Sequence, residues 1–418
     1  MARILLSAYA CEPNKGSEPN VGWLWATQLA FLGHEVWVIT RAANQAAIEG
    51  ELETQHRDNL HFVFCDLAPW ARRWKRLPGA IYLYCFLWQW LAYRQARRLT
   101  ERLPFDCVQH VTFVSLRAPS FMGLLRIPFY FGPVSGGERV PWRLRRRMSL
   151  KSKMFELLRD VSNAALRCDP VMRMAFGRAQ RIYITGVESL SLVPARYRDK
   201  CVVQLAVGIP RAQLGFSARR IAPSTGTLRC LYVGRLLEWK GLRLALLAIA
   251  RLKAQGVPAQ LTLIGDGPAH GILQRLADEL RVSENLCWVG LLPNNEVQRQ
   301  YSRHHVLLFP SLRDSGGIAV LEALAHGLPV ICTDLGGPGV IVTKQCGCVI
   351  PTGGRTEAQI ANDIAGHLHR LARNRGLLER LSIGARRRAW DFEFLSLAEA
   401  IHGPEQPIQN VAFEVAFS

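Results

Sequence analysis

The stretch from Val306 to Ile331, VLLFPSLRDSGGIAVLEALAHGLPVI, constrains the fold of this chain more than any other. Its first four residues are apolar and predict a buried strand, Pro310 to Gly317 predicts a loop, and the apolar run through Ala325 predicts a helix. A second strand is expected after Pro329. Because a strand, a loop, a helix and a strand in this order form the repeating unit of parallel sheets, the stretch predicts an α/β fold.

The loop of this stretch also has the residues of a binding site. Gly316 and Gly317 stand where the helix is expected to begin, so backbone N–H groups can point at an anion without an intervening Cβ. Asp314 lies in the loop, and Glu322 lies about two turns further on. The loop therefore predicts a site for a phosphate and sugar-like hydroxyl groups, although Gly-rich helix starts also occur in parallel sheets without such a ligand.

The whole stretch resembles the signature of the group 1 transferases, the retaining glycosyltransferases of family four. Their usual motif has two glutamates separated by seven residues, followed by Ala, a small residue, Gly, any residue, Pro and Val. Here Glu322 matches the second glutamate, and the segment from Ala323 to Val330 matches the rest of the motif. Asp314 stands in place of the first glutamate and is one methylene shorter. The resemblance implies that Glu322 binds ribose hydroxyls and that Asp314 orients hydroxyls of the donor sugar.

A second motif lies after the expected strand Cys230 to Val233. Arg235 and Lys240 both come after the carboxyl end of this strand, where two cations can hold a diphosphate, although they could also be a solvent-exposed pair. The segment resembles the Gly-Arg and Lys-Gly element of the same family, whose Arg and Lys bind the donor diphosphate. Asp314, Arg235 and Lys240 are therefore predicted to be catalytic and donor-binding, with Gly316, Gly317 and Glu322 on the donor as well.

The N-terminal part predicts a second α/β domain. A strand from Ile4 to Tyr9 precedes the loop CEPNKGSEPNVG, a helix and another strand. By resemblance, Gly16 in this loop approaches the donor phosphates, and His110, near the end of a later strand, contacts the sugar or aligns the acceptor. The turn with Gly136, Gly137 and Glu138 is similar to an acceptor-side loop of polysaccharide-assembling members. The loop CEPNKGSEPNVG could also be an ordinary surface loop.

Two doubly wound Rossmann-like domains facing each other across a cleft, the GT-B architecture, are the fold that the resemblance implies. We expect the N-terminal domain over 1–207, a Gly-, Pro- and Ser-rich linker over 208–227, and the donor domain over 228–388. A helix over 389–402 is expected to cross back to the first domain, and 403–418 to form a tail. The resemblance covers Ile4 to about Ile401.

The charge of the chain indicates anionic partners. It has 52 Lys and Arg against 33 Asp and Glu, a net charge of +19, with most of the excess in the N-terminal half. Trp70 to Arg98 is crowded with aromatic residues and flanked by arginines, which favours a helix lying in a membrane interface but is equally consistent with a buried core helix. Trp142 to Lys153 is a second basic segment that suits anionic headgroups. We expect no nucleic-acid partner, because no recognised nucleic-acid module is visible.

The cysteines and the N-terminus bear on compartment and metal. The 11 cysteines are dispersed without zinc spacing, which predicts free thiols and no structural metal. The apolar run at Met1 is too short for a signal peptide. We expect a cytoplasmic protein, peripheral at the inner face of the cytoplasmic membrane. No DxD motif occurs, so we expect no metal dependence and no cofactor, the nucleotide sugar being a co-substrate.

The predicted function is transfer of a hexose from a nucleoside diphosphate sugar to a hydroxyl, with retention at the anomeric carbon. The basic, aromatic surface suggests a lipid-linked saccharide acceptor, as in exopolysaccharide, O-antigen or lipopolysaccharide assembly. Two alternatives remain open. One is a non-catalytic scaffold that binds nucleotide sugar or lipid, motivated by Asp314. The other is a different GT-B enzyme, such as a nucleotide-sugar epimerase or a phosphorylase.

Overall fold

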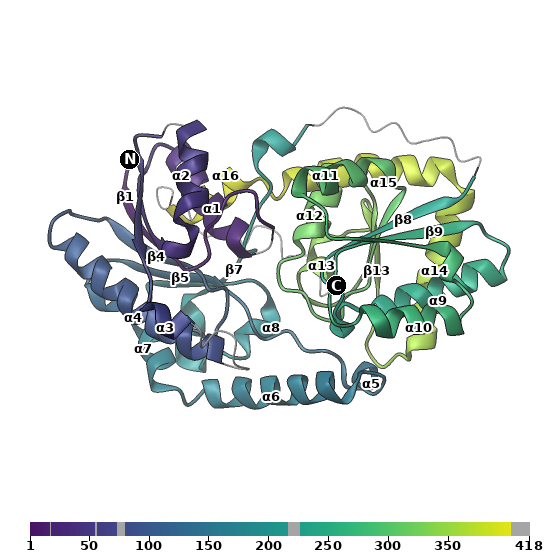
Figure 1. Cartoon of the computed structure of the whole chain (residues 1–418), viewed down its shortest axis with the longest axis horizontal. Coiled ribbons are helices and arrows are strands. Elements are labelled where there is room, and N and C mark those ends of the chain that lie inside the picture. The colour runs from purple at the N-terminus through teal and green to yellow at the C-terminus, as the bar shows by residue number, and fades with distance from the viewer. Residues whose placement is uncertain (17, 55–56, 73–79, 216–225, 403–418) are drawn as a thin grey trace. The chain divides into compact units, whose positions relative to one another are not determined.

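The computed structural model describes residues 1–16, 18–54, 57–72, 80–215 and 226–402 of the 418-residue chain. Within them the chain divides into two compact units. The first comprises 1–137, 158–208 and the helix that begins at Phe394, and the second comprises 138–157 and 209–393. Figure 1 shows both units with their elements labelled.

The first unit is built on a seven-stranded parallel sheet in the order β3-β2-β1-β4-β5-β6-β7. Helices α1, α2 and α16 lie on one face of this sheet and α3, α4 and α7 on the other (Figure 1). The elements are β1 Arg3–Ala8, α1 Glu18–Phe31, β2 Glu35–Arg41, α2 Gln45–Thr54, β3 Leu60–Cys65, α3 Pro69–Arg72, α4 Ala80–Thr100, β4 Cys107–Thr112, β5 Phe129–Val134, α7 Pro170–Arg178, β6 Arg181–Ile184, α8 Val187–Leu190, β7 Cys201–Val203 and α16 Phe394–His402.

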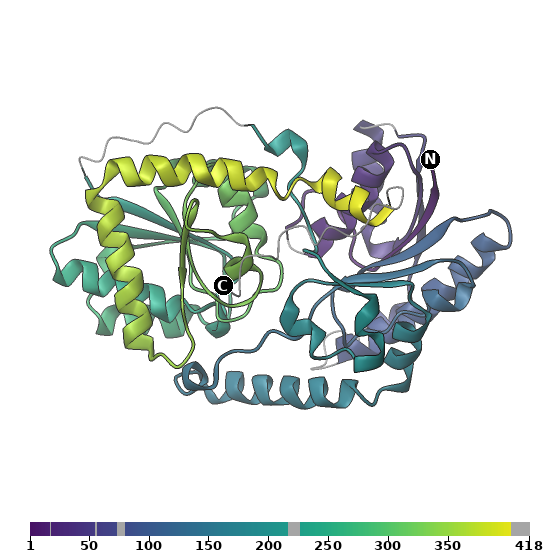
Figure 2. The same cartoon turned by 180° about the vertical axis from the view of Figure 1, so that it is seen from behind.

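The second unit has a six-stranded parallel sheet in the order β10-β9-β8-β11-β12-β13. Helices α9, α10 and α14 cover one face and α11, α12 and α15 the other (Figure 1), and Figure 2 shows the same layers from behind. The elements are α5 Trp142–Arg145, β8 Leu228–Val233, α9 Leu242–Ala254, β9 Ala259–Ile264, α10 His270–Glu279, β10 Leu286–Gly290, α11 Asn294–Arg303, β11 Val306–Phe309, α12 Ile318–Ala325, β12 Val330–Thr333, α13 Gly336–Ile341, β13 Gly347–Ile350, α14 Glu357–Arg373 and α15 Arg375–Trp390. Helix α6, Leu150–Leu166, begins in this unit and ends in the first.

The central strands of both sheets are mostly buried because helices cover both faces. All six residues of β4 and all four of β11 are buried. The prediction of two parallel α/β sheets is therefore confirmed. The strand expected from Val306 onward and the one expected after Pro329 are β11 and β12, paired in parallel.

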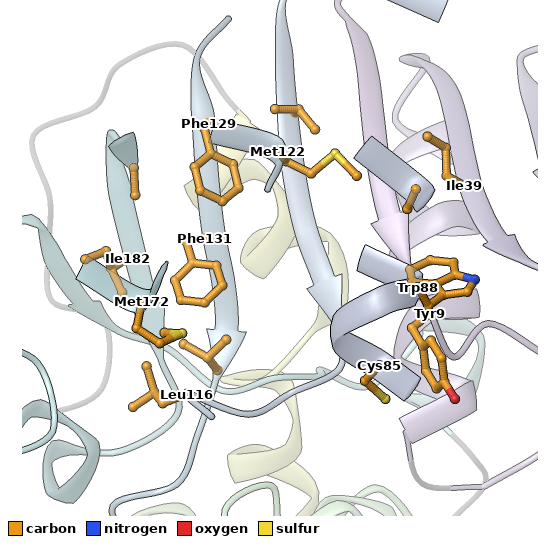
Figure 3. Close-up of a cluster of buried hydrophobic side chains, with 14 of the residues drawn as sticks. Tyr9, Ile39, Cys85, Trp88, Leu116, Met122, Phe129, Phe131, Met172 and Ile182 are labelled. Carbon is orange, nitrogen blue, oxygen red and sulfur yellow. The ribbon is translucent and has the colours of Figure 1, made fainter. Parts of the chain in front are cut away.

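Helix α4 contributes aromatic side chains to the core of the first unit. Tyr84 and Trp88 of this helix are completely buried, and the Trp88 ring meets Tyr9 edge-on at 5.1 Å (Figure 3). Phe129, Phe131 and Met172 belong to the same core (Figure 3). Much of the aromatic face of α4 is therefore core, which agrees with the alternative interpretation of this segment, while its residues 73–79 lie outside the described residues. No helix in the described part of the chain is long and apolar enough to cross a membrane.

Two segments group differently from the expected domain boundaries. Residues 138–157 belong to the second unit, although the sequence places them within the first domain. The last helix begins at Phe394 instead of near residue 389, because α15 continues to Trp390. Helix α16 packs on α1 of the first unit, where Phe394 meets Trp25 at 5.1 Å and His402 bonds Gln109.

Candidate active site

The carboxyl edge of the second sheet brings the predicted donor residues together. Strand order runs outward in opposite directions from the neighbouring strands β8 and β11, so the connections from these two strands leave on opposite sides. Ligands of open parallel sheets bind beyond the carboxyl ends of strands at such a switch point. Arg235 and Lys240 come after β8, and Asp314, Gly316 and Gly317 come after β11. The fold therefore places the two sequence motifs side by side.

The carboxylate of Asp314 is the centre of this group. One of its oxygens accepts a hydrogen bond from the ammonium of Lys240. The other accepts hydrogen bonds from the backbone N–H groups of Gly316 at 3.1 Å and Gly317 at 2.9 Å. Burial disfavours the charged form of Asp314. The Lys240 charge and the two N–H groups outweigh burial and hold the pKa of this carboxyl below its usual value. Asp314 thus occupies the positions at which the sequence predicts an anionic ligand.

Two glycines let the loops of this site approach each other. At Gly241, which comes directly after Lys240, φ is +68° and a Cβ would lie 1.9 Å from the carbonyl oxygen of Pro310. At Gly336, φ is +63° and a Cβ would lie 2.1 Å from the carbonyl oxygen of Asp314. Any larger residue would push the Asp314 loop away from its neighbours. The backbone around Asp314 is therefore fixed from two sides.

Glu322 lies on α12, on the same side of the sheet as Tyr301 of α11. Its Oε2 accepts the hydroxyl of the completely buried Tyr301 at 2.7 Å, and the Tyr301 ring lies 5.4 Å from that of His326. Burial raises the pKa of Glu322, and the Tyr301 hydroxyl partly opposes this shift. One carboxylate edge of Glu322 is thus held by tyrosine. Sequence reasoning missed Tyr301, because nothing in the pattern of α11 separates it from an ordinary core residue.

Helix α6 contributes a further part of this unit that no motif indicated. Glu156 is completely buried, 2.9 Å from Arg313 and 3.6 Å from Arg145. The Arg313 guanidinium stacks on Trp239 at 4.5 Å. Because Arg313 and Asp314 are adjacent in sequence, Glu156 fixes the backbone that presents Asp314. A contact between residues so far apart in sequence leaves no local signal.

Arg235, by contrast, is exposed at the end of β8, and its carbonyl accepts the hydroxyl of Tyr232 at 3.0 Å. Burial, with a smaller contribution from Asp314, raises the pKa of Tyr232, so this hydroxyl stays protonated and fixes the Arg235 backbone.

Within the described residues, no group of three or more His, Cys, Asp and Glu side chains is arranged to hold a metal ion.

The first unit has its own switch point, between β1 and β4. His110, on β4, is completely buried; its Nε2 lies 3.2 Å from the carbonyl oxygen of Phe113, and its Nδ1 has no hydrogen-bond partner among the described residues. Burial lowers the pKa of His110 to about 4, so the ring is neutral at pH 7. Gly16 is exposed in the loop after β1, with open space where a Cβ would be. The roles predicted for both residues stay predictions.

Two residues at this edge were not singled out from the sequence. Glu18, at the start of α1, accepts the backbone N–H of Val114 at 2.5 Å, and burial raises its pKa. Arg41, at the end of β2, donates to the carbonyl of Tyr9 and stacks on its ring at 4.5 Å. The acids of the β1 loop were the available signal for Glu18.

The predicted acceptor loop is tightly bonded. The carbonyl oxygen of Gly136 accepts hydrogen bonds from the side chains of Arg117 at 3.1 Å, Arg159 at 2.9 Å and Asn163 at 3.1 Å. Gly137 donates its N–H to Ser189, and a Cβ on Gly137 would lie 2.2 Å from the backbone of Glu188. Close packing against Glu188 therefore explains the glycine at position 137 without any ligand. Glu138, the next residue, is buried.

Comparison with known proteins finds a family similarity within the second unit. Residues 217–388 match the family model of the group 1 glycosyl transferases, and this segment contains Arg235, Lys240, Asp314 and Glu322. The predicted family is therefore supported on the segment that contains the predicted donor residues.

Two relatives of known name are also named as glycosyltransferases. The chain is 27% identical over 267 residues to 2-deoxystreptamine glucosyltransferase of Streptomyces kanamyceticus, covering 64% of this chain and 62% of that protein. It is 31% identical over 143 residues to the putative colanic acid biosynthesis glycosyltransferase WcaL of Salmonella typhimurium, covering 32% of this chain and 35% of that protein. The matches thus span less than two thirds of the length of either relative.

The fold is shared over nearly the whole chain. HepE of Anabaena, solved in complex with UDP, superposes with a TM-score of 0.64 at 14% identity, covering 96% of this chain and 98% of that one. Such a likeness establishes the fold, which is that of the GT-B glycosyltransferases. The predicted architecture of two Rossmann-like domains is confirmed.

Proposed function

We propose that this protein is a retaining hexosyltransferase that moves a sugar from a nucleoside diphosphate sugar to a hydroxyl of a lipid-linked saccharide. The supporting observation is the convergence of Lys240, Asp314 and the start of α12 at the switch point between β8 and β11. Relatives named for polysaccharide biosynthesis, such as WcaL, support the saccharide acceptor. The structural neighbour with bound UDP supports a uridine nucleotide as donor.

The chemistry derives from the charges at this edge. Departure of the nucleoside diphosphate leaves negative charge on its outer phosphate while positive charge develops on the sugar ring. Lys240, Arg235 and the N–H groups of Gly316 and Gly317 stabilise the leaving diphosphate. Since Lys240 and both N–H groups are bonded to Asp314 in this structure, donor binding requires the carboxylate to turn away from them.

Asp314, once released, becomes available to the sugar. Its carboxylate then accepts hydrogen bonds from donor-sugar hydroxyls, while the oxygen of Glu322 that is not held by Tyr301 accepts ribose hydroxyls. The two cations neutralise the leaving group, so we propose that the reaction needs no metal. Unchanged turnover after treatment with a chelator is the expected result, and restoration by Mg²⁺ of activity lost to the chelator would contradict it.

The donor assay is a heat-stability panel. UDP, UDP-glucose, UDP-galactose, GDP-mannose, ADP-glucose and dTDP-glucose are tested against wild type and Lys240→Met. A ligand that binds only the folded state raises Tm by an amount set by its concentration relative to Kd, and a hundredfold excess adds about 2.7 kcal/mol of stability. We expect uridine nucleotides to shift wild type and Lys240→Met to lose most of the shift. No shift with any donor at saturation would refute the proposal.

Turnover is tested separately with the donor so identified. Release of UDP only when a membrane saccharide fraction is added distinguishes transfer from hydrolysis or epimerisation, and the anomeric coupling constant of the product reports retention or inversion.

A non-catalytic scaffold is the second candidate, favoured by the Asp314 carboxylate bonded to both the cation and the helix start. It predicts donor binding without turnover in wild type, and turnover in Asp314→Glu.

A further inference from the structure

Helix α6 (Figure 1) has an apolar face that the described residues leave uncovered. Five large side chains on this face are between 58% and 82% exposed. They are Leu150, Met154, Leu157, Leu158 and Val161. At about 100° per residue, these positions fall within an arc of roughly 100° on one side of the helix. An apolar stripe of this kind normally faces the core of a protein.

The opposite side of α6 is polar and buried, so the usual arrangement of an amphipathic helix is reversed. Glu156 and Asn163 lie on this side and are completely buried. Glu156 pairs with Arg313 of the second unit, and Asn163 bonds Arg117 and Gly136 of the first. Polar contacts therefore hold the inner side of α6, and its apolar side is turned outward.

The start of α6 is fixed in the same way. Glu238 accepts the backbone N–H of Ser149 at 2.7 Å and the hydroxyls of Ser149 and Ser152. Phe155, at the border of the apolar side, stacks on Trp239 at 5.4 Å. With its first turn held by an acid and its flank by an aromatic ring, the helix cannot roll to bury its stripe without breaking these contacts.

The charges around the stripe identify the kind of partner. Arg146, Arg147 and Lys151 are exposed beside its N-terminal end, and Trp142 just before them is 76% exposed. Helix α6, which the structure describes over its whole length, has two acids, of which Glu156 is completely buried and Asp160 is half-buried. Exposed apolar side chains, flanking cations and an exposed tryptophan suit the boundary between anionic headgroups and acyl chains.

We propose that the outward face of α6, with the cations before and within its first turn, docks on an anionic lipid bilayer. The stripe extends about 17 Å along the helix axis, enough for an interfacial contact and too short to span the hydrocarbon. The docking surface is thus α6 and the basic segment before it, whereas the aromatic helix α4 serves the core. This inference rests on the proposed function and deepens it, because a lipid-linked acceptor lies at the same bilayer surface.

The test is flotation of the full chain with vesicles of phosphatidylcholine, alone or with one part in three of phosphatidylglycerol. We expect wild type to float with the anionic vesicles and to be released by salt. Met154→Gln/Leu158→Gln, which changes two exposed positions to another good helix former, should lower the partition coefficient at least about tenfold. Arg146→Gln/Lys151→Gln should lower it roughly tenfold on anionic vesicles and little on neutral ones.

The matched control is Leu291→Gln/Ile383→Gln, which removes two exposed apolar side chains of the second unit away from α6. This control should float like wild type. Flotation of the α6 variant at the wild-type level would overturn the proposal. Loss of flotation on removal of residues 403–418 would also overturn it, since lipid binding would then belong to the tail. A concentration-dependent dimer that only the α6 variant abolishes would overturn it as well, since the apolar face would then bind a second copy of the chain.

Donor binding is measured on the same proteins without lipid. The α6 variant should keep the wild-type Tm and the wild-type shift with UDP, which shows that it is folded. Flotation without any donor shift would leave the docking surface standing and refute the proposed transfer reaction, whereas a donor shift without flotation would do the reverse.

Discussion

Replacing Asp314 by Asn should destabilise the second unit by about 2–4 kcal/mol. The Asp314 carboxylate is 14% exposed and its partner Lys240 is 18% exposed, so water screens this pair only weakly. Removing one partner of a buried pair costs about 3–5 kcal/mol, because the other charge stays in a poorly solvated place. An Asn oxygen can still accept the N–H groups of Gly316 and Gly317, so the start of α12 stays capped and the loss is smaller.

Asp314→Ala removes this cap as well and should cost about 1 kcal/mol more. The measurement is denaturation by urea, followed by a probe in the second unit, for wild type, Asp314→Asn, Lys240→Met and the double variant. The coupling energy of the cycle isolates the pair. A coupling below about 0.5 kcal/mol would refute the assignment of Asp314 as the anionic partner of Lys240.

Asp314→Asn also separates the two proposed roles of Asp314, which are pairing with Lys240 and binding the hydroxyls of the donor sugar. Because the carboxylate no longer competes with the diphosphate for Lys240, we expect Asp314→Asn to bind UDP more tightly, by roughly tenfold. Its kcat with the sugar donor should fall, because the amide accepts hydroxyl groups more weakly. Since the folded pKa of Asp314 is lowered, the stability from its charge is present above about pH 4 and is lost at lower pH. Equal UDP affinity in wild type and variant would contradict the competition.

Three further predictions concern other parts of the chain. Burial lowers the pKa of His110 to about 4 and that of His402 to about 3, below the unfolded value of about 6.5, so stability is full above that value and falls as pH drops. The free energy of unfolding should fall by about 2 kcal/mol per histidine between roughly pH 7 and pH 5. In His402→Leu the midpoint of urea denaturation should therefore depend less steeply on pH than in wild type. An unchanged pH dependence in this variant would contradict the prediction. Gly241→Ala should abolish donor shifts and cost at least about 2 kcal/mol, measured by calorimetry, because its Cβ would meet a carbonyl oxygen at 1.9 Å. Glu156→Gln should raise KM for the donor and lower Tm by roughly 5 °C or more, since two arginines lose their buried partner, and wild-type KM would refute its link to the Asp314 loop.

The residues of the candidate donor site belong to two compact local motifs in the sequence. Arg235 and Lys240 come after one apolar strand, and Asp314 and Glu322 come after another. Parallel strands end at a common edge, and β8 and β11 lie next to each other, so the two motifs lie side by side. The sequence could not show that Asp314 bonds Lys240 and the helix start, since this depends on side-chain positions across the strand order.

The two segments that were considered for a membrane surface show the same limit. Trp70 to Arg98 and Trp142 to Lys153 both combine aromatic and basic residues in sequence. Tertiary packing buries Tyr84 and Trp88 of α4, whereas α6 turns Glu156 inward. Composition reports what a helix contains and not which side a neighbouring element covers.

The sequence alone determined the alternation of apolar strands and helices, the glycine-rich helix start and the excess of positive charge, because each is written in adjacent residues. Only the tertiary structure decided which strands became neighbours, which carboxylate bonds Lys240 and the start of α12, and which face of α6 stays outside. These features arise from contacts between residues far apart in the chain. Their energies depend on burial and on the partners that the fold supplies, such as Arg313 for Glu156.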